Sequence, residues 1–595
     1  MSNGWRGVVA GLAILAGAAG CPAMASADAA AAADLRGLIR EYWEGYLEAS
    51  PRAATSIGIK GYDARLEDNS AAGLARERSR LARVLERARV IDAAALPAAD
   101  RMNHAALIEI VESRLLEMEC GFEEWVVDPL RGPHVWILNL PDITTIDTPQ
   151  DAANFVDRCT AFQPWMQRHI DGLERGLEGG RVASADAIRK SIEALDALLA
   201  RPIPEWPALA PALEPRPAWN ARDRERFERN LAAAVEKRVR PALERYRAFL
   251  DENLRPAARP QQKAGLAALP GGADCYRKMI RVETSLDLSP DDLHRTGLEH
   301  VARFRADLAE LGARVFGTSD VAEIQKRLRA DAAMHFTTAG EVEAKAQEAL
   351  DRARAAIPDW FGILPRAACE VKVMGDHEAP NSTIAYYRRP SINGSRPGYY
   401  MINTWRPETR PRYEAEALAF HESIPGHHLQ IAIAQELLDV PPFRKAQGVT
   451  AFVEGWALYT ERLADDMGLY TSDLDRIGML SYDAWRACRL VVDTGMHAMG
   501  WSRQQAIDYM LENSVLAENN IVNEVDRYLT WPGQALAYKV GQIEILALRE
   551  EARKRLGERF DIRAFHDAVL RNGAVSLPVL RDQVEAWIEA AEARP

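Results

Sequence analysis

Three histidines and a glutamate lie together in the stretch HESIPGHH, residues 421–428. Imidazole nitrogens are common zinc ligands in proteins, and a neighbouring carboxylate can take a proton from an attacking water. The whole chain holds 12 histidines, so three of them within eight residues favour a metal site over isolated structural histidines. The motif therefore predicts a zinc site with Glu422 as general base.

The spacing departs from the common zinc-peptidase pattern HExxH, in which two histidines lie one helical turn apart. Four residues after His421 stands Pro425, which offers no ligand atom. On an unbroken helix, His427 would lie about 240° around the axis from His421, and His428 would lie roughly 10 Å along it. Neither pair could hold one ion at about 2 Å, so the helix must be interrupted.

Pro425 and Gly426 suit such an interruption, because proline removes a backbone donor and glycine tolerates unusual dihedral angles. If two residues loop out of the helix, His427 takes the place of the second histidine of HExxH. We therefore expect His421 and His427 to be metal ligands, with His428 as the alternative to His427.

Glu454 is the best candidate for a third protein ligand, which would leave one position of a tetrahedral ion open. It lies far enough after His427 for the motif helix to end and a second helix to return. Glu461 falls two turns further on the same helix face and could orient a ligand histidine. The apolar and aromatic segment around both residues, FVEGWALYTE, argues against a simple pair of surface glutamates.

Further polar residues late in the chain are candidates for contacts with a substrate or a transition state. They are Arg489, Asp493, His497, Tyr528, Tyr538 and Lys539. The first three are spaced by four and therefore share a helix face. The last three flank the turn at residues 532–533. A buried ion pair between Arg489 and Asp493 explains those two equally well.

Most of the chain is predicted to be helical. Segments 34–48, 72–90, 222–250 and 290–311 place apolar residues at spacings of three and four and are rich in strong helix formers. Ser289-Pro290 predicts a helix start. The proline-rich stretches 201–217 and 255–272 predict loops, and the second divides an N-terminal helical region, 28–265, from a catalytic region, 266–595.

Strand character is concentrated just before the motif. Residues 370–374 alternate between apolar and polar, and residues 398–403 are rich in β-forming side chains, with a turn at 391–398 between them. The sequence thus predicts a small sheet beside the motif helix. Four tyrosines suit either a cleft wall beside an edge strand or a sheet core, namely Tyr386, Tyr387, Tyr399 and Tyr400.

Composition excludes some classes of partner. Apolar residues make up 48% and charged residues 27% of the 595 residues, which is ordinary for a soluble globular protein. A formal net charge of -12 without a long basic run argues against nucleic acid or an anionic membrane as the main partner. We expect no membrane-spanning helix, because no segment after the N-terminus is long and apolar enough.

Residues 1–27 are predicted to be an export signal, because Arg6 precedes a short apolar run and small-residue cleavage patterns. A periplasmic or secreted protein follows, with a lipid anchor at Cys21 as the less favoured alternative. The five later cysteines form no CxxC pair, which argues against a cysteine zinc site. One or two disulfides and buried free thiols fit them equally well.

Four segments together resemble the bacterial "domain of unknown function 885" family. They are residues 420–430, FVEGWALYTE, residues 486–497 and PGQALAYK at 532–539. The resemblance covers most of the chain beyond the signal. That family is in turn distantly similar to thimet oligopeptidase, neurolysin and carboxypeptidase Taq, which are helical zinc peptidases.

The resemblance implies a mainly α, neurolysin-like zincin fold with a deep channel and a small sheet beside the metal helix. In those peptidases the third ligand is a glutamate followed seven residues later by another, a spacing that Glu454 and Glu461 keep. A late histidine and tyrosine there contact the tetrahedral intermediate, which implies catalytic roles for His497 and Tyr538. The two extra residues in the HExxH motif are a departure from the related peptidases.

These observations predict zinc-dependent hydrolysis of peptide bonds, and the resemblance implies short peptides as substrates. Two alternatives remain open: a metal hydrolase acting on another amide or ester, and a non-catalytic metal-binding envelope protein. The presence of Glu422 counts against the second, because binding alone needs no general base. Two histidines and a glutamate would also suit another divalent ion.

Overall fold

The computed structural model describes residues 22–593 except 376–378, 380–382, 391–395 and 439, with side chains described from residue 29 onward. The predicted export signal and Cys21 therefore lie largely outside the described residues, as does most of the predicted turn at 391–398. No helix among the described residues is long and apolar enough to cross a membrane.

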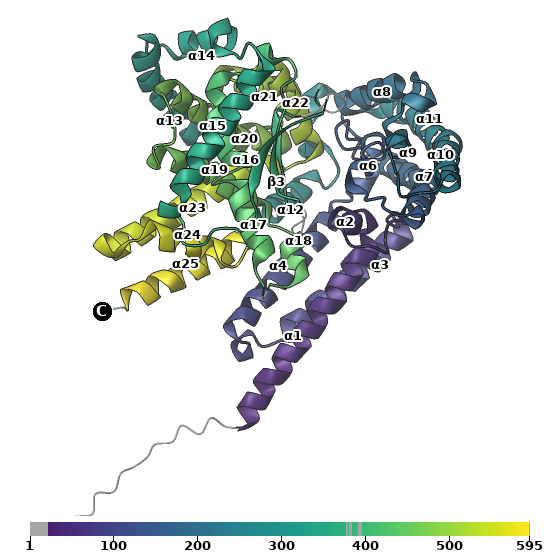
Figure 1. Cartoon of the computed structure of the whole chain (residues 1–595), viewed down its shortest axis with the longest axis horizontal. Helices are drawn as coiled ribbons and strands as arrows, with labels where there is room; N and C mark the ends of the chain where they lie inside the picture. Colours follow the sequence, from purple (N-terminus) through teal and green to yellow (C-terminus); the bar gives the residue numbers. More distant parts are fainter. Residues whose placement is uncertain (1–21, 376–378, 380–382, 391–395, 439, 594–595) are drawn as a thin grey trace, which may run out of the picture.

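The described chain is mainly helical, as the sequence predicts. The helices of the N-terminal region are α1 (Pro22–Ala49), α2 (Pro51–Ser56), α3 (Ala71–Val90), α4 (Ala98–Glu119), α5 (Pro133–Trp136), α6 (Leu140–Ile143), α7 (Pro149–Glu178), α8 (Ala185–Leu199), α9 (Ala210–Leu213), α10 (Ala221–Ala234) and α11 (Arg240–Phe249). Figure 1 shows them in purple and blue along one side of the molecule, with α1 as a long rod at its lower edge.

The remaining helices form the larger part of the molecule, coloured teal to yellow in Figure 1. They are α12 (Gly272–Thr284), α13 (Pro290–Phe316), α14 (Val321–Ala330), α15 (Ala339–Ala356), α16 (Ala415–Glu422), α17 (His427–Glu436), α18 (Pro442–Ala446), α19 (Thr450–Asp466), α20 (Asp473–His497), α21 (Arg503–Asn513), α22 (Glu518–Thr530), α23 (Ala537–Leu556), α24 (Ile562–Leu570) and α25 (Leu577–Glu592). Single helical turns connect several of them.

Helix α13 shows how the sequence sets these elements. The Ser289 hydroxyl accepts a hydrogen bond from the Asp292 backbone N–H at 3.0 Å, and Pro290 occupies the first turn, where its missing donor costs nothing. The helix ends at Gly317, which adopts the left-handed conformation. Its apolar stripe packs along α20, so it supports the helix that carries the arginines described below.

One small sheet stands among the described residues, with strands β1 (Cys369–Val373), β2 (Ala385–Arg388) and β3 (Gly398–Ile402) in the order β1-β3-β2. The strand segments predicted at 370–374 and 398–403 are confirmed. They pair in parallel with each other, and β2 pairs antiparallel with β3 at the sheet edge. The sequence analysis did not identify β2, because four residues are too few to show an alternating pattern.

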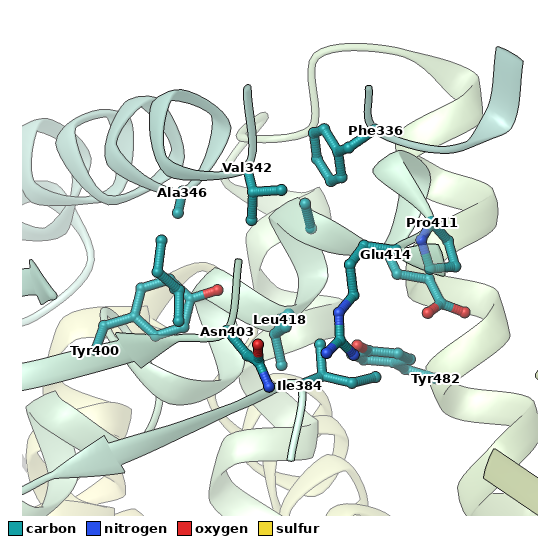
Figure 2. Close-up of a pocket in the computed structure, with 13 residues that line it drawn as sticks. Phe336, Val342, Ala346, Ile384, Tyr400, Asn403, Pro411, Glu414, Leu418 and Tyr482 are labelled. Atoms are coloured by element: carbon teal, nitrogen blue, oxygen red, sulfur yellow. The ribbon is translucent and has the colours of Figure 1, made fainter. Parts of the chain in front are cut away.

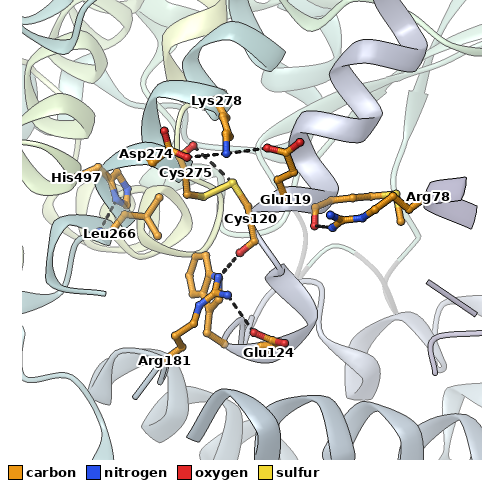
Figure 3. Close-up of a disulfide and its surroundings, with 12 residues drawn as sticks. Arg78, Glu119, Cys120, Glu124, Arg181, Leu266, Asp274, Cys275, Lys278 and His497 are labelled. Carbon is orange, nitrogen blue, oxygen red and sulfur yellow. Dashed lines mark hydrogen bonds and ion pairs between the residues drawn. A yellow bond between two sulfur atoms is a disulfide. The ribbon is translucent and has the colours of Figure 1, made fainter. Parts of the chain in front are cut away.

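The apolar core consists of several clusters, and the largest includes Cys120 and Trp125 of the N-terminal region. One core cluster draws all its buried residues from between Val127 and Leu254, and a larger one extends through the second half of the chain. Cys120 at the end of α4 and Cys275 in α12 form a disulfide across the sequence boundary between the regions (Figure 3). Cys159, Cys369 and Cys488 are buried free thiols.

Helices α19 and α23 approach each other so closely that only glycine fits at their crossing. A Cβ atom on Gly455 would lie 2.4 Å from the Cα of Gly541, and one on Gly541 would lie 1.8 Å from the Ala451 carbonyl oxygen. This contact fixes the position of α19 against the larger core.

A methyl group at this crossing tests the contact. We expect Gly455→Ala to lower the free energy of unfolding by about 1–3 kcal/mol, because the helices must separate to admit it. The matched control is Gly340→Ala in the first turn of α15, where a Cβ meets nothing within 4 Å. That control should be neutral or stabilising by less than about 1 kcal/mol. Equal melting temperatures for both variants would contradict the close crossing.

Candidate metal centre

The motif helix is interrupted where the histidine spacing requires it. Helix α16 ends at Glu422 and α17 begins at His427, with residues 423–426 between them. The His428 backbone N–H reaches back to the Ser423 carbonyl at 3.0 Å, which spans the extra residues. The indole N–H of Trp456 in α19 donates to the Pro425 carbonyl oxygen at 3.0 Å, so the neighbouring helix holds the loop.

Gly426 is essential to this loop for steric reasons. A Cβ atom there would lie 1.9 Å from the carbonyl oxygen of His421 and 2.4 Å from that of Phe420. Both oxygens belong to the last turn of α16, so the loop folds tightly back on the helix that it leaves. A side chain at position 426 would push His427 away from His421.

The interruption brings His421, His427 and Glu454 together. Their nearest ligand atoms all lie within 4.8 Å of one another, the only such group of three found among the described residues. Glu454 Oε2 lies 3.5 Å from His427 Nε2 and 3.9 Å from His421 Nε2. Tetrahedral ligands at about 2 Å from an ion are roughly 3.3 Å apart. The donor set and its spacing thus fit a zinc ion with small adjustments.

His428 lies outside this group. Its Nδ1 is 3.0 Å from the Tyr387 hydroxyl, and its Nε2 is 3.1 Å from the Ala367 carbonyl oxygen, to which it can donate. A Cβ on Gly398 would lie 2.6 Å from the same ring. The residue therefore ties α17 to the sheet, and the geometry favours His427 over His428 as the second ligand.

Glu461 holds the His421 ring from behind. Its Oε1 lies 2.8 Å from His421 Nδ1, which leaves Nε2 facing Glu454. Both side chains are buried, and the Arg486 guanidinium lies 3.9 Å from the same carboxylate oxygen. Such a carboxylate–histidine pair fixes the orientation of a ligand ring and increases its basicity.

Burial and neighbouring charges set the protonation states of the three residues. Burial lowers the pKa of His421 well below its usual value, so the ring is neutral and free to coordinate. Burial also opposes protonation of His427, but the hydrogen bond and charge of Glu454 outweigh it and raise that pKa. For Glu454, burial alone would raise the pKa, yet His427 lowers it, so the carboxylate stays ionised.

Glu422 lies beside this group at the end of α16. Burial raises the pKa of its carboxyl above the usual value, and the charge of His427 acts in the opposite direction. The backbone N–H of Tyr387 in β2, one of the two edge strands of the sheet, contributes to lowering that pKa, so β2 lies near the carboxylate. The edge of the sheet therefore faces the base predicted from the sequence.

Two of the residues predicted late in the chain, Tyr528 and Tyr538, contact a third, Arg489. Its Nε donates to the Tyr528 hydroxyl at 2.9 Å, and the Tyr538 ring centroid lies 4.4 Å from its guanidinium carbon. The positive charges of Arg489 and Arg486 reach Glu454 and contribute to lowering the pKa of that carboxyl. The Tyr538 hydroxyl makes no hydrogen bond to any described residue.

The other three predicted residues make hydrogen bonds within the fold. They are Asp493, His497 and Lys539. His497 is fully buried; its Nδ1 accepts from the Leu266 N–H, and its Nε2 can donate to the Tyr528 carbonyl, so it has no free donor for an oxyanion (Figure 3). Asp493 accepts from the Tyr276 hydroxyl at 2.6 Å and does not pair with Arg489. Lys539 donates to Asp483 at 2.6 Å. The geometry does not support the catalytic role expected for His497.

The tyrosines of the sheet also differ in whether they belong to the core or lie near the metal group. Tyr400 is 1% exposed and belongs to the core, and the Tyr387 side chain faces His428, while its backbone faces Glu422. A pocket lies next to Tyr400, between α15, the sheet and the start of α16 (Figure 2). Its lining is mostly apolar and includes the polar side chains of Asn403, Arg410 and Glu414, and no residue of the metal group lines it.

Arg486 is the residue near the metal group that the sequence analysis did not single out. It is buried, it contacts Glu461, and its guanidinium packs on the rings of Tyr482 and Trp485. Its spacing of three from Arg489 would have placed both arginines on one face of α20.

The fold and the metal group define a mainly helical protein with a largely buried cluster of two histidines and a half-buried glutamate beside a small sheet. The chain belongs to the family of bacterial proteins of unknown function DUF885, whose model matches residues 51–584. No curated protein matches the chain.

Two solved structures share the fold. One is a candidate lipoprotein from Colwellia psychrerythraea, 27% identical, with a TM-score of 0.87 over 94% of this chain and 99% of that chain. The other is a candidate lipoprotein of unknown function from Shewanella oneidensis, 16% identical, with a TM-score of 0.71 over 92% of this chain and 99% of that chain.

Adjacent histidines provide a matched test of the metal ligands. Loss of a residue that hydrogen-bonds to a metal ligand typically reduces metal affinity by roughly 10–100-fold. We expect His427→Ala to reduce zinc affinity by more than this, because it removes a direct ligand. His428→Ala should keep its zinc and lose only stability, about 1 kcal/mol for each lost hydrogen bond. Metal content after dialysis and melting temperature distinguish the two. Zinc loss from His428→Ala alone would reverse the assignment.

Proposed function

We propose that this protein is a zinc-dependent peptidase that uses Glu422 as its general base. The observation that carries the proposal is the convergence of His421, His427 and Glu454 beside the half-buried carboxylate of Glu422. A purely structural zinc site would need four protein ligands and no base. Three ligands and an adjacent carboxylate are what hydrolysis requires.

The chain's own residues supply the remaining chemistry. A zinc ion held by His421, His427 and Glu454 would polarise the scissile carbonyl and the attacking water. Glu422 accepts a proton from that water and passes it to the leaving amine, a role that suits a carboxyl whose pKa is raised by burial. Glu461 keeps the His421 ring in place throughout.

The developing oxyanion needs a donor, and Tyr538 fits this role better than His497. The Tyr538 hydroxyl has no hydrogen-bond partner among the described residues, and its ring stacks against Arg489, whose charge reaches the metal group. A hydroxyl donor without another partner can follow the charge as it forms. The interactions of His497 with backbone groups leave it no such freedom.

Two features support a peptide as the substrate. The edge strand β2 lies against Glu422, and an edge strand can pair with an extended peptide backbone. The spacing of Glu454 and Glu461, with its contact to His421, resembles the arrangement in thimet oligopeptidase and carboxypeptidase Taq. We extend this to a neurolysin-like zincin architecture with short peptides as substrates.

The relatives also bear on where the protein works. Both solved structures are described as candidate lipoproteins, which is consistent with the export signal predicted at residues 1–27. We propose an exported protein of the cell envelope, whether free in the periplasm or held by a lipid at Cys21.

Removing the base while keeping the ligands tests the mechanism. We expect Glu422→Gln to retain zinc and to lose about 10²–10⁴-fold in kcat/KM on a peptide library, because the amide cannot accept the proton. Glu436→Gln on α17 is the control, since that carboxylate accepts from the backbone N–H groups of Arg366 and Ala367 and pairs with the Arg366 guanidinium, away from the metal group. Full activity of Glu422→Gln would disprove the mechanism. Absence of zinc from the wild-type protein would disprove the site.

A further inference from the structure

Three arginines near the metal group have more hydrogen-bond donors than the described structure uses. Arg486 and Arg489 lie on α20 and are 4% and 2% exposed, and Arg527 lies on α22. No described residue accepts a hydrogen bond from Arg486 Nε, Arg489 Nη1 or Arg527 Nε, although all three atoms are buried, and Arg527 Nη2 has only the ion pair with Glu524 at 3.4 Å. Buried donors without acceptors are costly, so the cluster is suited to an additional acceptor.

The charges in this arginine cluster are also unbalanced. Glu524 Oε2 lies 2.9 Å from Arg489 and 3.4 Å from Arg527, so one carboxylate serves two guanidinium groups. Arg486 has Glu461 at 3.9 Å, but that carboxylate is already engaged by His421. Within ion-pair distance, the three guanidinium groups therefore share two carboxylates among the described residues, Glu461 and Glu524.

Aromatic rings shape the cluster into a receptor for a planar group. The Trp485 ring lies 4.4 Å from the guanidinium carbons of both Arg486 and Arg489, and the Tyr538 ring lies against Arg489. Stacking keeps the guanidinium planes fixed while their edges remain available for hydrogen bonds. A carboxylate matches such an edge with two parallel N–H···O bonds.

The cluster is connected to the metal group on one side and to solvent on the other. The charges of Arg489 and Arg486 contribute to the pKa of Glu454, which places them within electrostatic reach of that ligand. On the other side, 19% of the Arg527 side chain is exposed. Beyond it, Arg131 of the N-terminal region packs over the Trp531 ring, 3.6 Å from the centroid, and is itself exposed.

We propose that Arg486, Arg489 and Arg527 bind the C-terminal carboxylate of the peptide, so that the enzyme removes residues from the C-terminal end of its substrates. This inference rests on the proposed peptidase function. A peptide chain ends in one α-carboxylate, and that group supplies acceptors for the unpartnered donors and a third carboxylate for the three guanidinium groups. The backbone of an internal stretch of peptide supplies neutral carbonyls only.

Three peptides that differ only at the C-terminus test the inference on the wild-type zinc-loaded protein. The first has a free carboxylate, the second a C-terminal amide, and the third an amide with glutamate as last residue. We expect kcat/KM for the first to exceed that for the second by about 100-fold, because desolvated charge pairs are worth that much or more. The third should resemble the second. If kcat/KM for the third peptide equals that for the first, the cluster binds a side-chain carboxylate and the inference is wrong.

A binding measurement separates this inference from the proposed function. The Glu422→Gln variant should bind the free-acid peptide about 100-fold more tightly than the amide, whether or not hydrolysis occurs. Equal cleavage of acid and amide would overturn the inference and leave the peptidase intact. Selective binding without cleavage by wild type would keep the carboxylate receptor and overturn the peptidase. Failure of both would overturn both.

Substitutions then assign the effect to the cluster. Arg527→Gln, at a partly exposed position, and the conservative Arg489→Lys should each reduce the preference for the free acid to less than about 10-fold. The control is Arg549→Gln, a similarly buried arginine on α23 that pairs with Asp466 at 2.8 Å. It should retain the full preference. If Arg527→Gln and Arg489→Lys retain the full preference for the free acid, as the control does, other residues bind the carboxylate.

Discussion

The break between α16 and α17 is the constraint on which the metal group depends. Two histidines six residues apart point in different directions on a regular helix, and only a sharp local change of path brings both to one ion. Gly426 permits that path, because its backbone lies against the carbonyl oxygens of Phe420 and His421 where a Cβ cannot fit. The extra residues in the motif are therefore accommodated by the backbone.

The surroundings of the break explain why it is stable. Trp456 donates to the loop from α19, which is the same helix that carries Glu454 and Glu461. The element that supplies the third ligand thus also fixes the loop that positions the second. His428, next to His427, ties the start of α17 to the sheet. Two adjacent histidines serve different purposes, one facing the metal group and one facing the scaffold.

The sequence predicted the helical class, the sheet location and the three residues that converge, because each depends on local pattern or on ligand chemistry. It could not assign partners along α20. Arg489 and His497 are spaced by four and four, but two such steps accumulate about 80° around a helix. His497 therefore turns toward Leu266, while Arg489 turns toward Tyr528. Likewise, the pairing of Cys120 with Cys275 depends on a tertiary contact that cysteine spacing does not encode.

The packing of Gly455 against α23 sets the position of its neighbour Glu454. Gly455 lies at the crossing with α23, where the backbones of the two helices are in contact through Gly541. Such a contact leaves little room for α19 to slide or rotate, because backbone atoms cannot change rotamer as side chains can. The ligand is thereby held on a rigid element, as catalytic geometry requires. The site is assembled from β2, the α16–α17 break, α19 and α20, all of which pack on the same core. The arginines of α20 beside it are then the residues on which substrate specificity depends.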